Sequence, residues 1–115
     1  MIAKIVSILT ILSSLAITVD SEKVFHLFAD SYREGHLITY GRPDDDRNCY
    51  NIDYRFARKA RSIKNGGFCV NLYSHNNCQG DRIRSEPYCS RSECCFDRDF
   101  EWCDFAYKAS SFKLC

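Results

Sequence analysis

The sequence predicts an all-β domain, a sandwich or barrel, that disulfides stabilise. Three observations support this prediction. A nine-residue segment recurs later in the chain, the apolar runs are short and separated by turn residues, and all eight cysteines lie after residue 48. Short strands at regular spacing are typical of sandwiches and barrels. An even number of cysteines in a short secreted chain indicates disulfides.

The first 21 residues are predicted to be a secretory signal peptide. Lys4 precedes an uncharged run over 5–19 that is rich in Ile and Leu, and this run is shorter than the about 20 residues of a membrane-spanning helix. Cleavage could follow Ala16 or Ser21, and cleavage after Ser21 removes the whole apolar run. The alternative is a buried N-terminal helix or strand. We expect a secreted, extracellular protein without a membrane span, whose single domain covers 22–115.

An internal repeat organises this domain. Residues 56–64 read F-A-R-K-A-R-S-I-K and residues 105–113 read F-A-Y-K-A-S-S-F-K, so six of nine positions are identical. Upstream, F-A-D-S-Y-R-E-G over 28–35 resembles Y-S-H-N-N-C-Q-G over 73–80, since both begin with an aromatic residue and end in Gly. The first pair of segments is offset by 49 residues and the second pair by 45. The second copy therefore has about four extra residues between its two segments, around Cys89–Cys95. The two units cover about 22–66 and about 67–115.

Each copy is predicted to form short strands, and Asn65-Gly66-Gly67 supplies a turn where the copies join. The clearest strands are expected over 24–28, 37–40, 69–73 and 82–84. No window of 11 or more residues after the first segment has a sustained helical stripe. Alternate strand residues should fill the core. The core candidates are Phe25, Leu27, Leu37, Phe56, Ile63, Val70, Leu72, Phe105, Phe112 and Leu114.

The repeat resembles the Greek-key motif of the βγ-crystallin superfamily, and this resemblance implies a β-sandwich of two Greek-key units. That motif has an aromatic residue, four residues, an aromatic or apolar residue, one residue and Gly. Tyr73, Cys78 and Gly80 match it with Cys at the inner position. Phe28 and Gly35 match the ends of the motif, although the inner aromatic, a tyrosine, stands one place early.

The resemblance also implies that a serine on the last strand of each copy holds a folded hairpin. Ser62 and Ser111 stand 34 and 38 residues after the aromatic that opens each motif. A hairpin folded so sharply needs a residue with positive φ, which Gly adopts without a Cβ clash. We therefore predict positive φ at Gly35 and Gly80.

The cysteines are predicted to form four disulfides, and four bridges among eight cysteines allow 105 connectivities. The resemblance places the first and last strands of a key side by side, which implies a Cys69–Cys115 bridge. Adjacent Cys94 and Cys95 should have different partners, because a ring between neighbours is strained. A zinc site over 89–103 is disfavoured because oxidising export disfavours thiolate ligands. The cysteines are Cys49, Cys69, Cys78, Cys89, Cys94, Cys95, Cys103 and Cys115.

Many βγ-crystallins bind calcium through two Asn or Asp residues, two variable residues, Ser or Thr, and Ser. The matching segments here read A-R-K-A-R-S over 57–62 and A-Y-K-A-S-S over 106–111. Both have lost the two oxygen-bearing residues, and calcium requires oxygen ligands. We expect no cofactor, no metal and no bound calcium; the acidic turn over 44–46 is the leading substitute site.

The chain is not predicted to be an enzyme, because it has no G-x-S-x-G, H-E-x-x-H or phosphate-loop motif and its three histidines stand in separate segments. A net charge of +1 gives no reason to expect nucleic acid as a partner. One basic stretch could contact an anionic cell surface or polysaccharide. Its members are Arg55, Arg58, Lys59, Arg61 and Lys64.

Two functional classes follow from these features. The first is a secreted, monomeric binding module, antimicrobial or toxin-like, or an effector acting on a cell surface; secreted proteins that resemble this family include antimicrobial proteins and a protease inhibitor. The second is a structural extracellular protein of a matrix or coat. Protease inhibition is a further alternative, which needs an exposed rigid loop.

Overall fold

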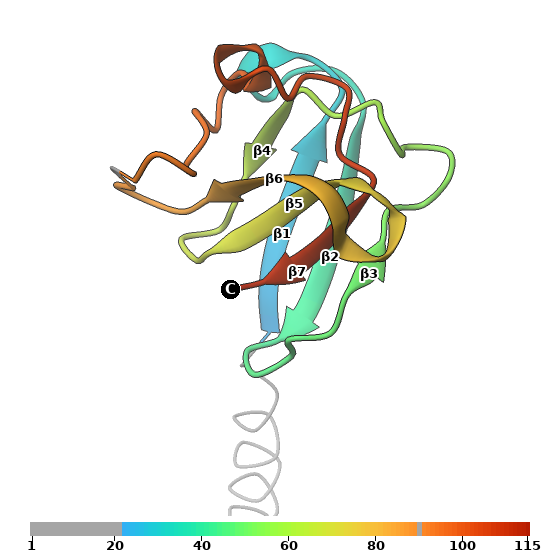
Figure 1. Cartoon of the computed structure of the whole chain (residues 1–115), viewed down its shortest axis with the longest axis vertical. Helices are drawn as coiled ribbons and strands as arrows, with labels where there is room; N and C mark the ends of the chain where they lie inside the picture. Colours follow the sequence, from blue (N-terminus) through green and yellow to red (C-terminus); the bar gives the residue numbers. More distant parts are fainter. Residues whose placement is uncertain (1–21, 90) are drawn as a thin grey trace, which may run out of the picture.

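The computed structural model describes residues 22–89 and 91–115 (Figure 1). The predicted signal peptide over 1–21 therefore lies outside the described residues. The described part is built from strands and short 3₁₀ turns, and none of its helices is long and apolar enough to cross a membrane. The strands are β1 (Glu22–Phe28), β2 (Leu37–Pro43), β3 (Tyr50–Asn51), β4 (Ser62–Lys64), β5 (Val70–His75), β6 (Gln79–Ser85) and β7 (Ser111–Leu114). The 3₁₀ turns are η1 (Ser31–Arg33), η2 (Asn76–Cys78) and η3 (Phe100–Cys103).

Two antiparallel sheets face each other, one with strand order β2-β1-β4 and the other with order β3-β7-β5-β6 (Figure 1). The first sheet is formed by strands of the first copy. The second sheet contains β5, β6 and β7 of the second copy together with β3 of the first, and Tyr50 of β3 stands opposite Phe112 of β7. The predicted all-β fold of two Greek keys is confirmed, and the copies are joined by exchange of a strand.

The segment of the second copy that matches β3 pairs in turn with a strand of the first copy. The N–H of Ile63 donates to the carbonyl of Asp97 at 2.8 Å, and the N–H of Phe100 donates to the carbonyl of Arg61 at 2.8 Å. Residues 97–100 therefore run beside β4, as β3 runs beside β7. Each copy completes the sheet of the other.

The repeated segments bind one another reciprocally. The N–H of Arg58 donates to the carbonyl of Ala109 at 2.8 Å, and the N–H of Tyr107 donates to the carbonyl of Ala60 at 2.9 Å. Arg58 and Tyr107, equivalent in the repeat, share a left-handed backbone with φ of 63° and 61°. The sequence repeat therefore has a counterpart in the three-dimensional structure.

The core lies between the two sheets, where the rings of Phe25 and Phe112 meet edge to face at 5.0 Å. Most of the predicted core residues are buried, but Leu37 is 52% exposed. The prediction for Leu37 was wrong because strand side chains alternate, and its neighbours Ile38 and Tyr40 pack against the core instead. Phe56 is only partly buried at the edge of the core. Sequence reasoning missed three large buried side chains, Ile52, Ile83 and Phe100.

Candidate functional site

The folded hairpin of the first copy is held by a buried serine. The hydroxyl of Ser62 donates to the carbonyl of Asp30 at 2.6 Å and accepts from the N–H of Arg33 at 3.0 Å. Ser62 stands opposite Phe28, the aromatic that opens the motif, and Gly35 closes the hairpin with a φ of 79°. One side chain thus satisfies two backbone groups that the sharp fold leaves without strand partners.

The second copy repeats this geometry. The hydroxyl of Ser111 donates to the carbonyl of His75 at 2.6 Å and accepts from the N–H of Cys78 at 2.9 Å. Ser111 stands opposite Tyr73, and Gly80 has a φ of 81°. The positive φ predicted for the two motif glycines is confirmed.

The eight cysteines form four disulfides, and none is free. The structure contains the Cys69–Cys115 pairing that the resemblance implied, and it gives the adjacent Cys94 and Cys95 different partners as predicted. The sulfurs of Cys89 and Cys94 lie near the carboxylate of Glu86. They are bonded to each other rather than available as thiolates, so this group does not suit zinc. The four bridges are Cys49–Cys78, Cys69–Cys115, Cys89–Cys94 and Cys95–Cys103.

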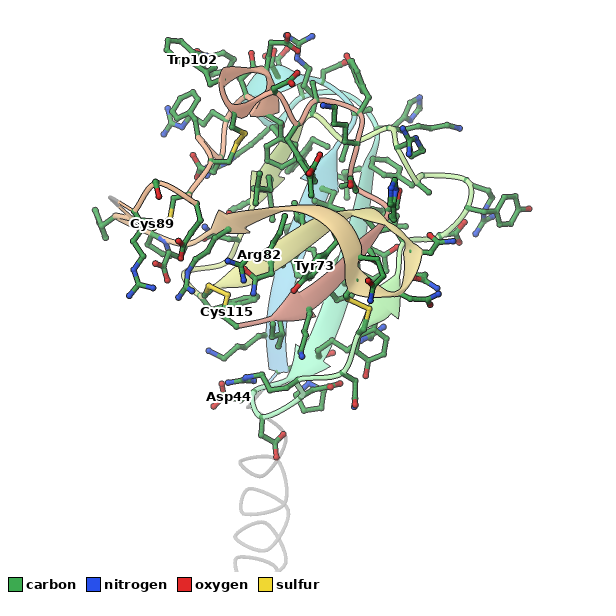
Figure 2. The ribbon with its side chains drawn as sticks, viewed as in Figure 1. Asp44, Tyr73, Arg82, Cys89, Trp102 and Cys115 are labelled. Carbon is green, nitrogen blue, oxygen red and sulfur yellow. A yellow bond between two sulfur atoms is a disulfide. The ribbon has the colours of Figure 1, made fainter. Side chains whose placement is uncertain are left out.

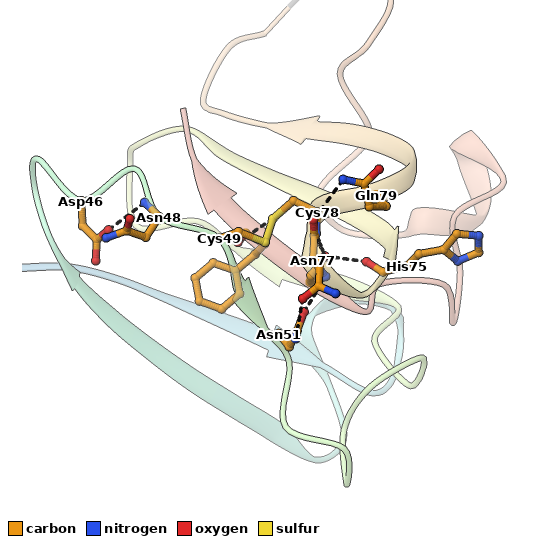
Figure 3. The surroundings of a disulfide bond; sticks show 10 residues. Asp46, Asn48, Cys49, Asn51, His75, Asn77, Cys78 and Gln79 are labelled. Carbon is orange, nitrogen blue, oxygen red and sulfur yellow. Dashed lines mark hydrogen bonds between the residues drawn. A yellow bond between two sulfur atoms is a disulfide. The ribbon is translucent and has the colours of Figure 1, made fainter.

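One of these bridges joins the two copies at the strand exchange (Figure 3). Cys49 directly precedes β3, and Cys78 belongs to the hairpin of the second copy. Beside the bridge, the N–H of Asn77 donates to the side-chain carbonyl of Asn51 at 2.7 Å. The side-chain amide of Asn51 donates in return to the side-chain carbonyl of Asn77 at 3.3 Å. Covalent and polar contacts therefore fix β3 against the second copy.

The basic stretch presents less unpaired charge than its sequence suggests. Arg55 forms an ion pair with Asp53 at 2.8 Å, and the hydrogen bond from Arg55 lowers the pKa of Asp53 to about 2. Lys59 donates to the carbonyl of Arg55 at 3.0 Å. Arg58, Lys59 and Lys64 are exposed and have no ion-pair partner in the part of the chain that the structure describes.

Arg61, the remaining member of the stretch, turns back to the second copy. Its guanidinium pairs with Asp99 at 3.0 Å and reaches the hydroxyl of Tyr107 at 3.4 Å. Hydrogen bonds from Arg61 lower the pKa of the Asp99 carboxyl below its ordinary value. Arg61 therefore joins the copies and is not directed to an outside partner.

Sequence reasoning missed an exposed group of aromatic side chains. The rings of Tyr32 (on η1), Phe96 and Trp102 (on η3) stand side by side in space. The ring centroids of Tyr32 and Phe96 lie 6.3 Å apart, and those of Phe96 and Trp102 lie 5.9 Å apart. They remain 54%, 43% and 77% exposed. We call these three residues the aromatic row. Figure 2 shows Trp102 projecting from the end of the molecule opposite Asp44.

Comparison with known proteins agrees with this architecture. No protein-family profile matches the sequence, and no curated protein matches it. A β/γ-crystallin from Ciona intestinalis is 14% identical, with a TM-score of 0.59 over 80% of this chain and 99% of that one. A βγ-crystallin from an archaeon is also 14% identical, with a TM-score of 0.59 over 84% of this chain and 100% of that one. The chain has a βγ-crystallin-like fold.

Protein S, solved in complex with calcium, is a third match to this βγ-crystallin-like module. It is 13% identical, with a TM-score of 0.54 over 82% of this chain and 49% of protein S. At such identities the likeness shows the fold alone, so a calcium role has to be tested on the residues of this chain.

The loop at residues 57–62 does not fit calcium. Its fifth position, where the calcium pattern has Ser or Thr, carries Arg61, and the guanidinium already binds the carboxylate of Asp99 at 3.0 Å. A fixed cation at this position repels a divalent ion instead of binding it.

The loop at residues 106–111 does not fit calcium either. The hydroxyl of Ser110, at the fifth position, donates to the carbonyl of Ser74 at 3.0 Å. The guanidinium of Arg58 reaches the same carbonyl at 3.5 Å. Each loop thus has an arginine close by and lacks the carboxylates that calcium prefers.

The acidic turn over 44–46 is also engaged with protein groups. Asp44 pairs with Lys23 at 3.0 Å. Asp46 accepts from the hydroxyl of Tyr50 and from the N–H of Asn48, and the hydrogen bond from Tyr50 is the largest influence lowering the pKa of Asp46. Asp45 is exposed. The turn is therefore held by internal partners and does not present converging carboxylates.

Proposed function

We propose that this chain is a secreted binding module, antimicrobial or toxin-like, which contacts a cell surface or extracellular polysaccharide and has no enzymatic activity. The observation that supports it is the placement of the disulfides. Cys89–Cys94 and Cys95–Cys103 close loops with sequence separations of only 5 and 8 residues.

Short bridges of this kind favour binding over a purely structural role. In the chain-entropy account, a bridge with a separation of 5 stabilises the fold by about 2 kcal/mol and one with a separation of 46 by about 4 kcal/mol. The short bridges therefore do less for global stability than for the shape of the surface segments over 86–89 and 91–103. A loop fixed before it meets its partner loses less conformational entropy on binding.

The surroundings of the histidines support a role without catalysis. The ring of His26 bonds the hydroxyl of Thr39 at 2.7 Å, and the ring of His75 bonds the carbonyl of Ser74 at 3.0 Å. Neither ring bonds a carboxylate among the described residues, as a catalytic triad would require. The four disulfides are in keeping with an oxidising extracellular medium.

The test uses the protein secreted from the full chain by an oxidising host. Mass spectrometry of the product checks whether residue 22 begins the mature chain. Binding is then measured to microbial cells, polysaccharides and lipid vesicles. We expect retention on at least one of these surfaces, and weaker retention when Cys89 and Cys94 are both replaced by Ser.

Three results would contradict the proposal. Absence of binding together with self-assembly into a matrix would favour the structural role. Inhibition in a panel of protease assays, without surface binding, would favour an inhibitor. Equal binding by the Cys89→Ser/Cys94→Ser variant would show that the bridged loop is not needed.

A further inference from the structure

We propose that the aromatic row of Tyr32, Phe96 and Trp102 binds an uncharged polysaccharide, whose sugar rings stack on its exposed faces. This inference rests on the proposed function and names the contact surface and the ligand class. It does not involve the basic stretch, so the two surfaces can be separated by mutation.

A disulfide holds Phe96 and Trp102 next to each other. Cys95 immediately precedes Phe96, and Cys103 immediately follows Trp102. Because Cys95 and Cys103 are bonded to each other, the two aromatic residues cannot drift apart in the folded protein. Phe96 and Trp102 also line an open surface hollow of about 180 Å³.

Polar contacts hold Tyr32 next to Phe96. Arg33, which follows Tyr32, pairs with Asp97, which follows Phe96, at 2.8 Å. In addition, the N–H of Tyr32 donates to the carbonyl of Arg98 at 2.6 Å. Each ring is thus anchored through the residue beside it in sequence, while the ring itself stays in solvent.

The backbone of Tyr32 has the same conformation as the matching residue of the second copy. Its φ is 57°, in the left-handed region, which costs a residue with a large side chain about 1–2 kcal/mol. The equivalent residue of the second copy is Asn77, with a φ of 60°, and Asn adopts this region readily. The strained tyrosine leaves 54% of its surface exposed, so core packing does not offset the strain. The hydrogen bonds of Ser62 to the hairpin hold this conformation, and it occurs also at the exposed Tyr88, with a φ of 55°, so it belongs to the fold and not to the row alone.

Grouping sets the row apart from the other exposed aromatic residues. Tyr54 and Tyr88 are 85% and 104% exposed, and neither ring stacks on another ring among the residues that the structure describes. Single exposed rings are ordinary on protein surfaces, whereas a contiguous apolar patch indicates a contact site. Tyr54, which lies outside the bridged loop, therefore serves as the matched control.

The charges near the row favour a neutral sugar over an anionic lipid surface. Two exposed carboxylates adjoin the row in sequence, Glu34 after Arg33 and Glu101 before Trp102. One exposed cation, Arg98, adjoins it. An anionic membrane would be repelled by this excess of negative charge, since such surfaces bind clustered Lys and Arg. Hydroxyl groups, in contrast, can donate to carboxylates and accept from guanidinium groups.

The chemistry of pyranose rings fits the remaining features. One face of a pyranose carries C–H groups with partial positive charge, and these pack on the negative face of an aromatic ring. The rings of the row meet edge to face, with interplanar angles of 75° and 66°. The surface is therefore stepped, and three consecutive rings suit a chain of sugars better than a single one.

The only tryptophan of the chain provides a direct readout. The secreted protein is titrated with soluble β-1,3-glucan, mannan and chitin oligomers while the emission of Trp102 and its quenching by acrylamide are recorded. Binding to insoluble chitin and cellulose is measured by depletion from solution. We expect one of these neutral glycans to shift the emission to shorter wavelength and to protect the indole from the quencher.

Variants then test the surface. Trp102→Ala and Phe96→Ala should weaken glycan binding at least tenfold, whereas Tyr54→Ala should leave it unchanged. Thermal unfolding and near-ultraviolet circular dichroism verify that each variant is folded. Arg58→Ala and Lys64→Ala serve as a second control, because the basic stretch is not part of the row.

Several outcomes would overturn the inference. If the protein binds cells or glycans and Trp102→Ala binds equally well, the row is not the contact surface, although the proposed function stands. If only phosphatidylcholine vesicles shift the emission, the row contacts membranes. If sedimentation detects a dimer that Trp102→Ala abolishes, the row is covered by a second copy. If no cell, glycan or vesicle is bound, the proposed function fails as well.

Discussion

Replacing Gly80 with Ala should destabilise the domain by about 2–3 kcal/mol, and the structure divides this loss into two parts. The first is conformational. Gly80 has a φ of 81°, where an L-residue with a Cβ atom loses about 1–2 kcal/mol. The second arises from contacts. An added Cβ would lie 2.4 Å from the hydroxyl of Ser74 and 2.8 Å from the ring of His75.

The contact part can be estimated from the hydrogen bond that the clash breaks. The hydroxyl of Ser74 accepts from the N–H of Asp81 at 2.8 Å. Because this hydroxyl must move away from a methyl group at residue 80, the bond is lost or lengthened. A bond of this kind contributes about 0.5–1.5 kcal/mol.

Gly67 supplies a matched control. Its φ is 91°, and nothing lies within 4 Å of a Cβ built on it. Gly67→Ala therefore has the conformational loss of about 1–2 kcal/mol without the clash. Both substitutions narrow the unfolded ensemble equally, so the difference between the two variants, about 1 kcal/mol, isolates the contacts at residue 80.

The measurement is urea unfolding of wild type and both variants with the disulfides intact. In a domain of this size, 1 kcal/mol corresponds to about 4–8 °C in melting temperature, so thermal unfolding gives an independent check. The reasoning is refuted if the two variants are equally stable, or if Gly80→Ala lies within about 0.5 kcal/mol of wild type, the range of ordinary surface substitutions.

Three further predictions concern the bridges, pH and calcium. Replacing both cysteines of the Cys69–Cys115 bridge by Ser should lower the free energy of unfolding by about 4 kcal/mol, and replacing those of Cys89–Cys94 should lower it by about 2 kcal/mol, because the bridges span 46 and 5 residues. Equal losses in urea unfolding would contradict this. The pKa of Asp99 is lowered by hydrogen bonds from its arginine partner. The stability that the ionised Asp99 gives the fold is therefore present above about pH 4 and is lost as the pH falls further. Asp99→Asn should accordingly reduce the drop in melting temperature between about pH 5 and 2. Millimolar calcium should change neither the melting temperature nor the heat measured by calorimetry, and micromolar binding would show that oxygen ligands converge somewhere in the fold.

The repeat made the fold predictable from sequence. The motif glycines and serines recur at fixed offsets, and such residues have a narrow range of backbone roles: Gly35 takes positive φ, and Ser62 bonds the hairpin. Leu37 was misplaced because a shift of one residue in a strand moves a side chain to the other face. Ile52 and Phe100 stand in short connecting segments, where no alternation marks them as buried.

The aromatic row could not be predicted in the same way. Tyr32 and Phe96 are 64 residues apart in sequence and are brought together by the exchange between copies, which no local pattern encodes. Phe96 and Trp102 are held together by a bridge whose partners sequence alone cannot assign. Arg61 likewise pairs with Asp99, 38 residues away in sequence, and no local pattern indicates this pairing.

The exchange of β3 has a consequence for the origin of the chain. A lone copy would lack the strand that completes its own sheet, so a single-unit ancestor could cover its sheet edge only by trading strands with a second molecule, as in domain swapping. Because both copies stand in one chain, the contact is intramolecular and does not depend on protein concentration. The Cys49–Cys78 bridge would in such an ancestor have linked two separate polypeptides.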